Sequence, residues 1–168
     1  MIELMQRYYA AERHTAMGAM AVGIALMLLS LLLWKTASTG SLARGMAYVF
    51  IVAGLFQFGA GVGYSVVVKA RAEEAVLFYS GHDERDIKRE ETARMERVIK
   101  SSFVGGLVTY TVLLLFGLAL LLLSIDAPTR KGVALALMIV GVLGHCIEAF
   151  SMQENRQYLM TIETRSIR

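Results

Sequence analysis

Four long stretches of the chain are almost free of charge, and short charged segments separate them. These apolar segments cover residues 15–34, 46–68, 103–125 and 133–152. None of them alternates polar and apolar residues, so the pattern indicates helices rather than strands. About 20 apolar residues in a helix cross the hydrocarbon core of a bilayer. The pattern therefore predicts an all-α protein, a bundle of four transmembrane helices in one membrane domain over residues 1–168.

The composition agrees with a protein dissolved in the lipid bilayer. Residues of the hydrophobic class make up 56% of the chain, and the mean hydropathy is +0.54. The formal net charge is +3, but the charged central segment holds eight basic and eight acidic residues and forms no basic patch. We therefore expect no binding of nucleic acid. The single cysteine, Cys146, excludes an intrachain disulfide.

Lysine and arginine are distributed unevenly along the chain. Thirteen lysines and arginines lie in the N-terminal arm, in the central segment and in the C-terminal tail, which includes Arg165 and Arg168. Only four lie in the two short loops that connect the apolar segments on the opposite side of the membrane. Basic residues collect on the cytoplasmic side of membrane proteins. We therefore expect both termini and the central segment in the cytoplasm.

The central segment, residues 69–102, predicts a helical hairpin outside the membrane. No helix breaker precedes Ser80-Gly81, and the chain reads as a helix again from Asp83. Acids stand four residues ahead of bases at Glu84/Lys88, Glu90/Arg94 and Glu96/Lys100. The candidate cytoplasmic interface consists of Glu84, Lys88, Glu91, Met95 and Glu96.

The two ends of the chain have helical apolar spacing, for example at Met5 and Tyr8 in the arm and at Tyr158 and Ile162 in the tail. Two structures are compatible with this spacing. The ends and the hairpin could form a short cytoplasmic four-helix bundle. Alternatively, the ends could be frayed amphipathic segments on the lipid headgroups.

The two halves of the chain, residues 12–68 and 96–152, resemble each other. Arg44-Gly45 recurs as Lys131-Gly132, 87 positions later, and a Glu-Arg pair precedes the first helix of each half. This pattern is typical of a parallel duplication about an axis along the membrane normal. Chance similarity between apolar helices is the alternative.

Few strongly polar side chains lie inside the apolar segments. Gln57, His145 and Glu148 form the candidate intramembrane polar site, since such residues are often functional. His145 and Glu148 are three residues apart and share a helix face. Two ligands are too few for a metal site, so we expect no metal and no cofactor. A structural polar contact is one interpretation of this pair, and proton or ion handling is the other.

Glycines form a stronger pattern in the second apolar segment, at Gly54, Gly59, Gly61 and Gly63. Small residues allow helix backbones to approach closely in a membrane. They indicate either packing within the chain or docking of a partner's helix, including that of a second copy in a homo-oligomer. The chain contains no P-loop, HExxH, GxSxG or CxxC motif, so we expect no enzyme activity.

The chain resembles small bacterial inner-membrane immunity proteins that protect against interbacterial toxins, such as those delivered by type VI secretion. The shared features are the arm YYAAERH, the segment EETARMERVIKSSF before the third apolar segment, and very short outer loops. The resemblance implies a non-enzymatic protein of the inner membrane that binds and blocks a membrane-targeted, pore-forming toxin. The toxin would dock on the glycine-bearing faces or on the cytoplasmic hairpin.

Two other functions are compatible with the sequence. A small transporter, channel or channel accessory would use Gln57, His145 and Glu148 along its path. A scaffold would recruit a cytoplasmic protein through the hairpin.

Overall fold

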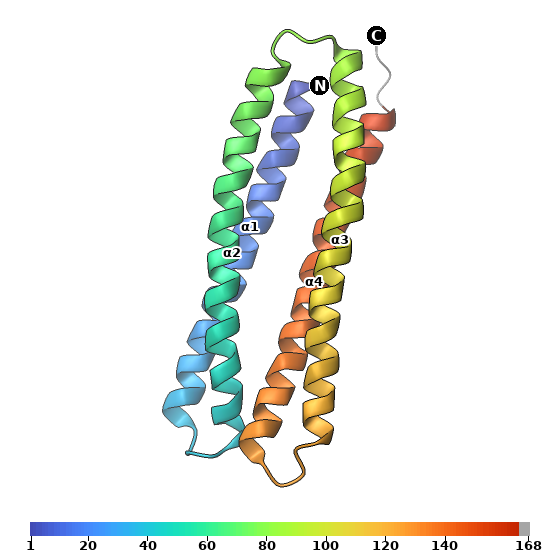
Figure 1. The fold of residues 1–168 in the computed structure, drawn as a ribbon. Helices are drawn as coiled ribbons and strands as arrows, with labels where there is room; N and C mark the ends of the chain where they lie inside the picture. Colours follow the sequence, from blue (N-terminus) through green and yellow to red (C-terminus); the bar gives the residue numbers. More distant parts are fainter. Residues whose placement is uncertain (165–168) are drawn as a thin grey trace.

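The computed structural model describes residues 1–164, without the side chains of residues 102 and 103, and consists of four long α-helices (Figure 1). They are α1 (Ile2–Thr36), α2 (Leu42–Tyr79), α3 (Glu84–Leu122) and α4 (Pro128–Thr164). No strand occurs in the described part of the chain, so the predicted all-α fold is confirmed. The tail residues Arg165 and Arg168, used above in counting charges, lie outside the described residues.

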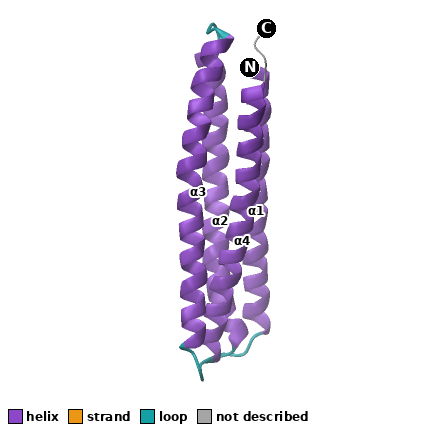
Figure 2. Cartoon of the chain, turned by 90° about the vertical axis from the view of Figure 1, so that its right-hand side faces the viewer, coloured by secondary structure: helices purple, strands orange, loops and turns teal. Residues whose placement is uncertain are grey.

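Each helix is longer than a bilayer is thick. The helices have 35 to 39 residues, which corresponds to about 52–58 Å, against about 30 Å of hydrocarbon core. By length and composition, all four could cross a membrane. The apolar segments lie toward the loops 37–41 and 123–127, and we call this part the apolar half. The N-terminus, the end of α4 at Thr164 and the 80–83 turn lie at the opposite end, in the polar half (Figure 2).

The helices begin and end at local sequence signals. The Ser41 hydroxyl accepts a hydrogen bond from the backbone N–H of Arg44 at 3.3 Å and caps α2. Gly81 has a φ of +109°, which glycine adopts without steric cost, and it reverses the chain between α2 and α3. The break predicted at Ser80-Gly81 and the helix predicted on both sides of it are confirmed.

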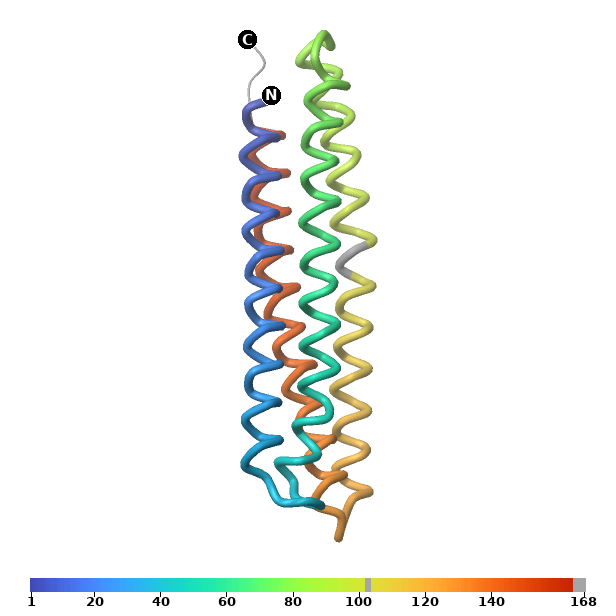
Figure 3. Tube along the Cα trace, turned by 90° about the vertical axis from the view of Figure 1, so that its left-hand side faces the viewer, coloured from blue at the N-terminus to red at the C-terminus, as the bar shows by residue number. Residues whose placement is uncertain are grey.

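The four helices form two hairpins joined mainly through α2 and α4. Helix α1 packs along α2, and α3 packs along α4. Helix α4 also packs against α2, whereas α2 and α3 make little contact. All four helices run the length of the molecule (Figure 3). We call the two boundaries between the hairpins the α1–α4 seam and the α2–α3 seam.

Glycines set the closest backbone contacts, and these contacts repeat after 87 residues. A Cβ on Gly45 would overlap the carbonyl of Thr129, and a Cβ on Gly132 would overlap that of Leu42. Likewise, a Cβ on Gly54 would lie 2.8 Å from the carbonyl oxygen of Gly23, and one on Gly141 would lie 3.1 Å from that of Tyr110. Such paired contacts are what a duplicated hairpin would produce, while the duplication itself stays a prediction.

The Glu-Arg pairs do not take part in this repetition. Glu12 is 8% exposed inside the bundle, whereas Glu96 lies on the surface. They are also 84 positions apart rather than 87.

The ends of the chain are packed rather than frayed. In the polar half, side chains from all four helices form one apolar core. Its buried members are Met5, Tyr8, Tyr9, Val68, Tyr79, Ile87, Met95, Tyr158 and Ile162. Of the two structures compatible with the sequence, the chain therefore adopts the four-helix extension. This core fixes the position of the polar groups described next.

Candidate functional site

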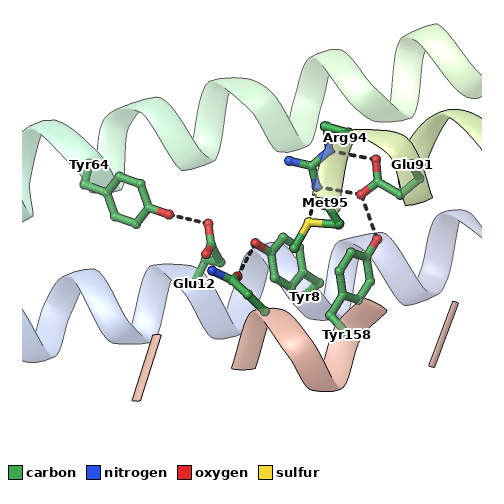
Figure 4. A network of polar contacts seen from close by, with 8 residues as sticks. Tyr8, Glu12, Tyr64, Glu91, Arg94, Met95 and Tyr158 are labelled. Carbon is green, nitrogen blue, oxygen red and sulfur yellow. Dashed lines mark hydrogen bonds and ion pairs between the residues drawn. The ribbon is translucent and has the colours of Figure 1, made fainter. Parts of the chain in front are cut away.

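A layer of buried polar side chains crosses the polar half, near its junction with the apolar half (Figure 4). At its centre, the guanidinium of Arg94 donates two hydrogen bonds to the carboxylate of Glu91, at 2.6 and 2.8 Å. Glu91 is 1% exposed, and the hydroxyl of Tyr158 donates to its Oε1 at 2.9 Å. One turn along α1 from Tyr8, the carboxylate of Glu12 accepts a hydrogen bond at Oε2 from the hydroxyl of Tyr64. Each buried carboxylate thus has a donor.

Aromatic rings hold this layer together across the α1–α4 seam. The rings of Tyr8 and Tyr158 are stacked, with centroids 4.0 Å apart. The Tyr8 hydroxyl donates to Oδ1 of Asn155 at 2.8 Å. The guanidinium of Arg94 lies 5.9 Å from the ring centroid of Tyr8 and 5.6 Å from that of Tyr9. A cation at such a distance over the face of an aromatic ring is attracted by the ring, so these contacts stabilise the position of Arg94.

Burial and partners determine the protonation states in this layer. Burial acts to lower the pKa of Arg94, but the hydrogen bonds and charge of Glu91 outweigh it and raise that pKa above its ordinary value. Burial, followed by the negative charge of Glu12, raises the pKa of the Tyr8 phenol. Burial, followed by the charge of Glu91, does the same for Tyr158. At neutral pH the layer therefore contains a charged arginine and neutral phenols.

A recess of about 400 Å³ opens to the surface above this layer, in the α2–α3 seam. Three of its lining residues, Tyr9, Glu91 and Arg94, belong to the polar layer. The others are Arg71, Glu74, Ala75, Phe78, Tyr79 and Val98. This volume and this mixture of apolar surface with a few polar groups are typical of ligand-binding sites.

The recess exists because the two seams are filled differently. In the α1–α4 seam, Tyr158 stacks on Tyr8 and Ile162 is fully buried. The positions 87 residues earlier, on α2, are Arg71 and Ala75, and both line the recess. An exposed arginine and a small alanine leave open the space that a tyrosine and an isoleucine fill in the other seam.

A second cavity of about 480 Å³ lies in the same seam, in the apolar half. It is walled by α2 and α3, has α4 as its floor, and is almost entirely apolar. Gln57 and Tyr110 lie at its deep end, and Tyr48 lies toward the loops.

Of the three residues of the predicted intramembrane polar site, two contact α3 and the third lines cavities. His145 Nε2 lies 3.3 Å from the hydroxyl of Thr111, and the Glu148 carboxyl packs against Gly106, so both residues contact α3. Gln57 lines the 480 Å³ cavity and a smaller one beside it, and neither cavity includes His145 or Glu148. Among the described residues, no three His, Cys, Asp or Glu side chains are placed to hold a metal ion.

The four glycines of α2 divide into two pairs. Gly54 and Gly61 are buried against α1, where an added Cβ would lie 2.7 Å from Met27 and from Met20, respectively. Gly59 and Gly63 have no atom within 4 Å of an added Cβ. The first pair therefore serves packing within the chain, and the second pair lies on an open face.

The predicted cytoplasmic interface is also divided. Glu96 is exposed, Lys88 donates to the backbone carbonyl of Glu163 at 2.8 Å, and Glu84 binds the N-terminal amino group at 3.1 Å. Glu91 and Met95, in contrast, are 1% and 0% exposed. Their positions on α3 face the core of the four-helix extension, and Glu91 also lines the 400 Å³ recess.

The sequence also pointed to the wrong partner for Arg94. The spacing of four residues favoured Glu90, whereas Arg94 pairs with Glu91, three residues away. Glu91 is buried beside Tyr158, and a buried acid holds an arginine more strongly than an exposed one does. In the sequence, the residue that indicated this buried polar layer was Glu12, because it is an acid at a position that the helical spacing places among apolar residues.

Comparisons of the chain with protein-family models, with curated proteins and with solved structures found no match.

Proposed function

We propose that this chain is a non-enzymatic, multi-pass protein of a bacterial inner membrane that binds and neutralises a membrane-targeted toxin. Both termini and the 80–83 turn face the cytoplasm in this proposal, in accordance with the excess of lysine and arginine at that end. The observation that carries the proposal is the 400 Å³ recess above the buried polar layer. The recess presents both aromatic rings and charged side chains to a partner, and aromatic and arginine side chains often anchor protein partners.

The polar layer beneath the recess supports binding rather than catalysis. Its carboxylates, phenols and guanidinium satisfy one another, and no buried side-chain nitrogen or oxygen among the described residues lacks a hydrogen-bond partner. A group that is fully engaged in the resting state supports the fold but has no free donor or acceptor for a substrate. Toxin neutralisation as the purpose of binding rests on the resemblance to immunity proteins.

The test is a co-culture of sister cells. A strain that lacks the gene should lose viability beside cells with an active toxin-secretion system and should survive beside cells in which that system is inactivated. Ala75→Trp, which fills the recess, should lower survival about tenfold, the effect of removing one well-filled contact.

Leu77→Trp is the matched control, because Leu77 is 76% exposed and does not line the recess. It should protect as well as the wild type. Equal survival of the deletion strain beside both kinds of neighbour would contradict the proposed function. Equal protection by both tryptophan variants would contradict only the recess as the docking site.

Transport is the second candidate, and the observation that favours it is an ionisable carboxyl in the apolar half. Glu148 lies between α3 and α4 with its carboxyl against Gly106. If the chain transports ions, Glu148→Gln should abolish flux in vesicles, whereas a binding protein should keep its protective effect with this substitution.

A further inference from the structure

The 480 Å³ cavity of the apolar half opens sideways, between two helices that make little contact. Its apolar lining includes Val52 and Phe56 of α2, Leu113 of α3, and Leu137 and Val140 of α4. The position equivalent to Leu137 is Phe50, which is 1% exposed and fills the corresponding space between α1, α2 and α4. A leucine in place of a phenylalanine thus contributes to the open volume in the α2–α3 seam.

A cation, Arg130, lies on α4 just before the first of its residues that line this cavity. Helix α4 lines the cavity with Val133, Leu137 and Val140, which are spaced four and three residues apart and so share one face of the helix. Arg130 is three residues before Val133 and lies on the same face. Arg130 is exposed and has no carboxylate within 4 Å among the described residues.

Aromatic residues mark the same level on the neighbouring helices. The rings of Trp34 and Tyr48 meet edge to face with centroids 5.2 Å apart, and the guanidinium of Arg44 lies 4.2 Å above the Trp34 ring. Tryptophan, tyrosine and arginine collect where lipid headgroups meet the hydrocarbon. The end of the cavity nearest the loops is therefore at headgroup level if the apolar half spans the membrane.

The distance along α4 from Arg130 to the deep end of the cavity corresponds to one leaflet. From Arg130 to Val140 the helix advances ten residues, or about 15 Å. Half of a hydrocarbon core is also about 15 Å. An acyl chain whose headgroup lies at Arg130 would thus end beside Val140, near Gln57 and Tyr110 at the deep end.

We propose that this cavity is a phospholipid site: one acyl chain lies in the α2–α3 seam of the apolar half, and the phosphate binds Arg130. The inference rests on the membrane placement in the proposed function, but not on toxin binding. A lipid held there separates α2 from α3 and completes the apolar half on the side where the chain leaves it open.

Native mass spectrometry of the full chain, released from nanodiscs of phosphatidylethanolamine and phosphatidylglycerol, tests the site. The wild type should retain one phospholipid that excess inorganic phosphate does not displace. Leu137→Phe should lose it, since this variant introduces the residue that the equivalent position already accommodates. Arg130→Gln should lower retention about fivefold, the effect of one cation near a headgroup.

Two control variants separate loss of the lipid site from a general effect of losing a charge or adding a ring. Lys131→Gln removes the neighbouring cation from a different face of α4, and Ile139→Phe adds a ring at a position that is 40% exposed and outside the cavity. Both should retain the lipid. Extraction of cell membranes with alkaline carbonate checks the membrane placement separately.

Three results would overturn the site: a wild type that retains no lipid, a Leu137→Phe variant that retains it fully, or equal retention by the Arg130 and Lys131 variants. A photoreactive residue at Val52 should label lipid in native membranes. Labelling of a protein instead would assign the seam to a partner helix and would also contradict the proposal.

Discussion

At the scale of single residues, the buried pair of Glu91 and Arg94 has the strongest consequences for stability. Glu91→Ala would leave the Arg94 guanidinium among tyrosine rings without its acid. Breaking a buried pair on one side costs about 3–5 kcal/mol. Denaturant titration of helicity should detect this loss in the free energy of unfolding. The control is Glu90→Ala, at the exposed neighbouring position, which should change stability little; equal losses would contradict the central role of the pair.

The buried phenols predict a loss of stability in alkali. Burial raises the pKa of Tyr8 and of Tyr158 above the ordinary value of 10.0 in the folded chain. The folded state therefore holds these protons more tightly than the unfolded state does. Their contribution is fully present below pH 10 and is lost as the pH rises beyond it, because the unfolded chain then releases the protons.

Absorbance of phenolate and helicity, both followed against pH, should report this alkaline transition. Tyr158→Phe should make the stability less dependent on pH above 10, although it also removes a hydrogen bond to Glu91. An unchanged pH dependence in this variant would contradict the assignment to Tyr158.

At the scale of helices, the two glycine pairs of α2 should respond differently to the same substitution. Gly54→Leu places a side chain against Gly23 and Met27 of α1, and overpacking of this kind costs about 1–3 kcal/mol. Gly59→Leu meets open space, so thermal unfolding in detergent should be unchanged. Loss of protection in the co-culture by Gly59→Leu would extend the partner interface to this face. Equal destabilisation by both variants would contradict the described packing of α1 on α2.

Local signals predicted most of the helices, whereas contacts distant in sequence decided the site. The apolar segments and the break at Ser80-Gly81 are local, so the four helices and the turn between α2 and α3 could be predicted. The contact of Tyr8 with Tyr158 joins residues far apart in the chain, and no periodicity encodes it. The burial of Glu91 depends on the ordering of both chain ends, which the sequence left open.

At the scale of the molecule, orientation is the prediction that both the proposed function and the lipid site need. In a Cys146→Ser background, a cysteine at Ser38 should react with a membrane-impermeant maleimide added to spheroplasts. A cysteine at Ser80 should react only after lysis. Both residues are exposed and lie in loops at opposite ends, so access alone decides the result. The reverse pattern would contradict the placement of the termini in the cytoplasm.

The length of the helices has an electrostatic consequence for any partner that binds near the 80–83 turn. From residue 68 to residue 80 the chain rises about 18 Å. The Debye length at physiological ionic strength is about 8 Å. The lipid headgroups occupy about 5–7 Å of that height, so a docked partner there is more than one screening length from the anionic membrane surface. Its affinity should therefore follow mainly the charges of the protein and change only weakly as the lipid composition of the membrane changes.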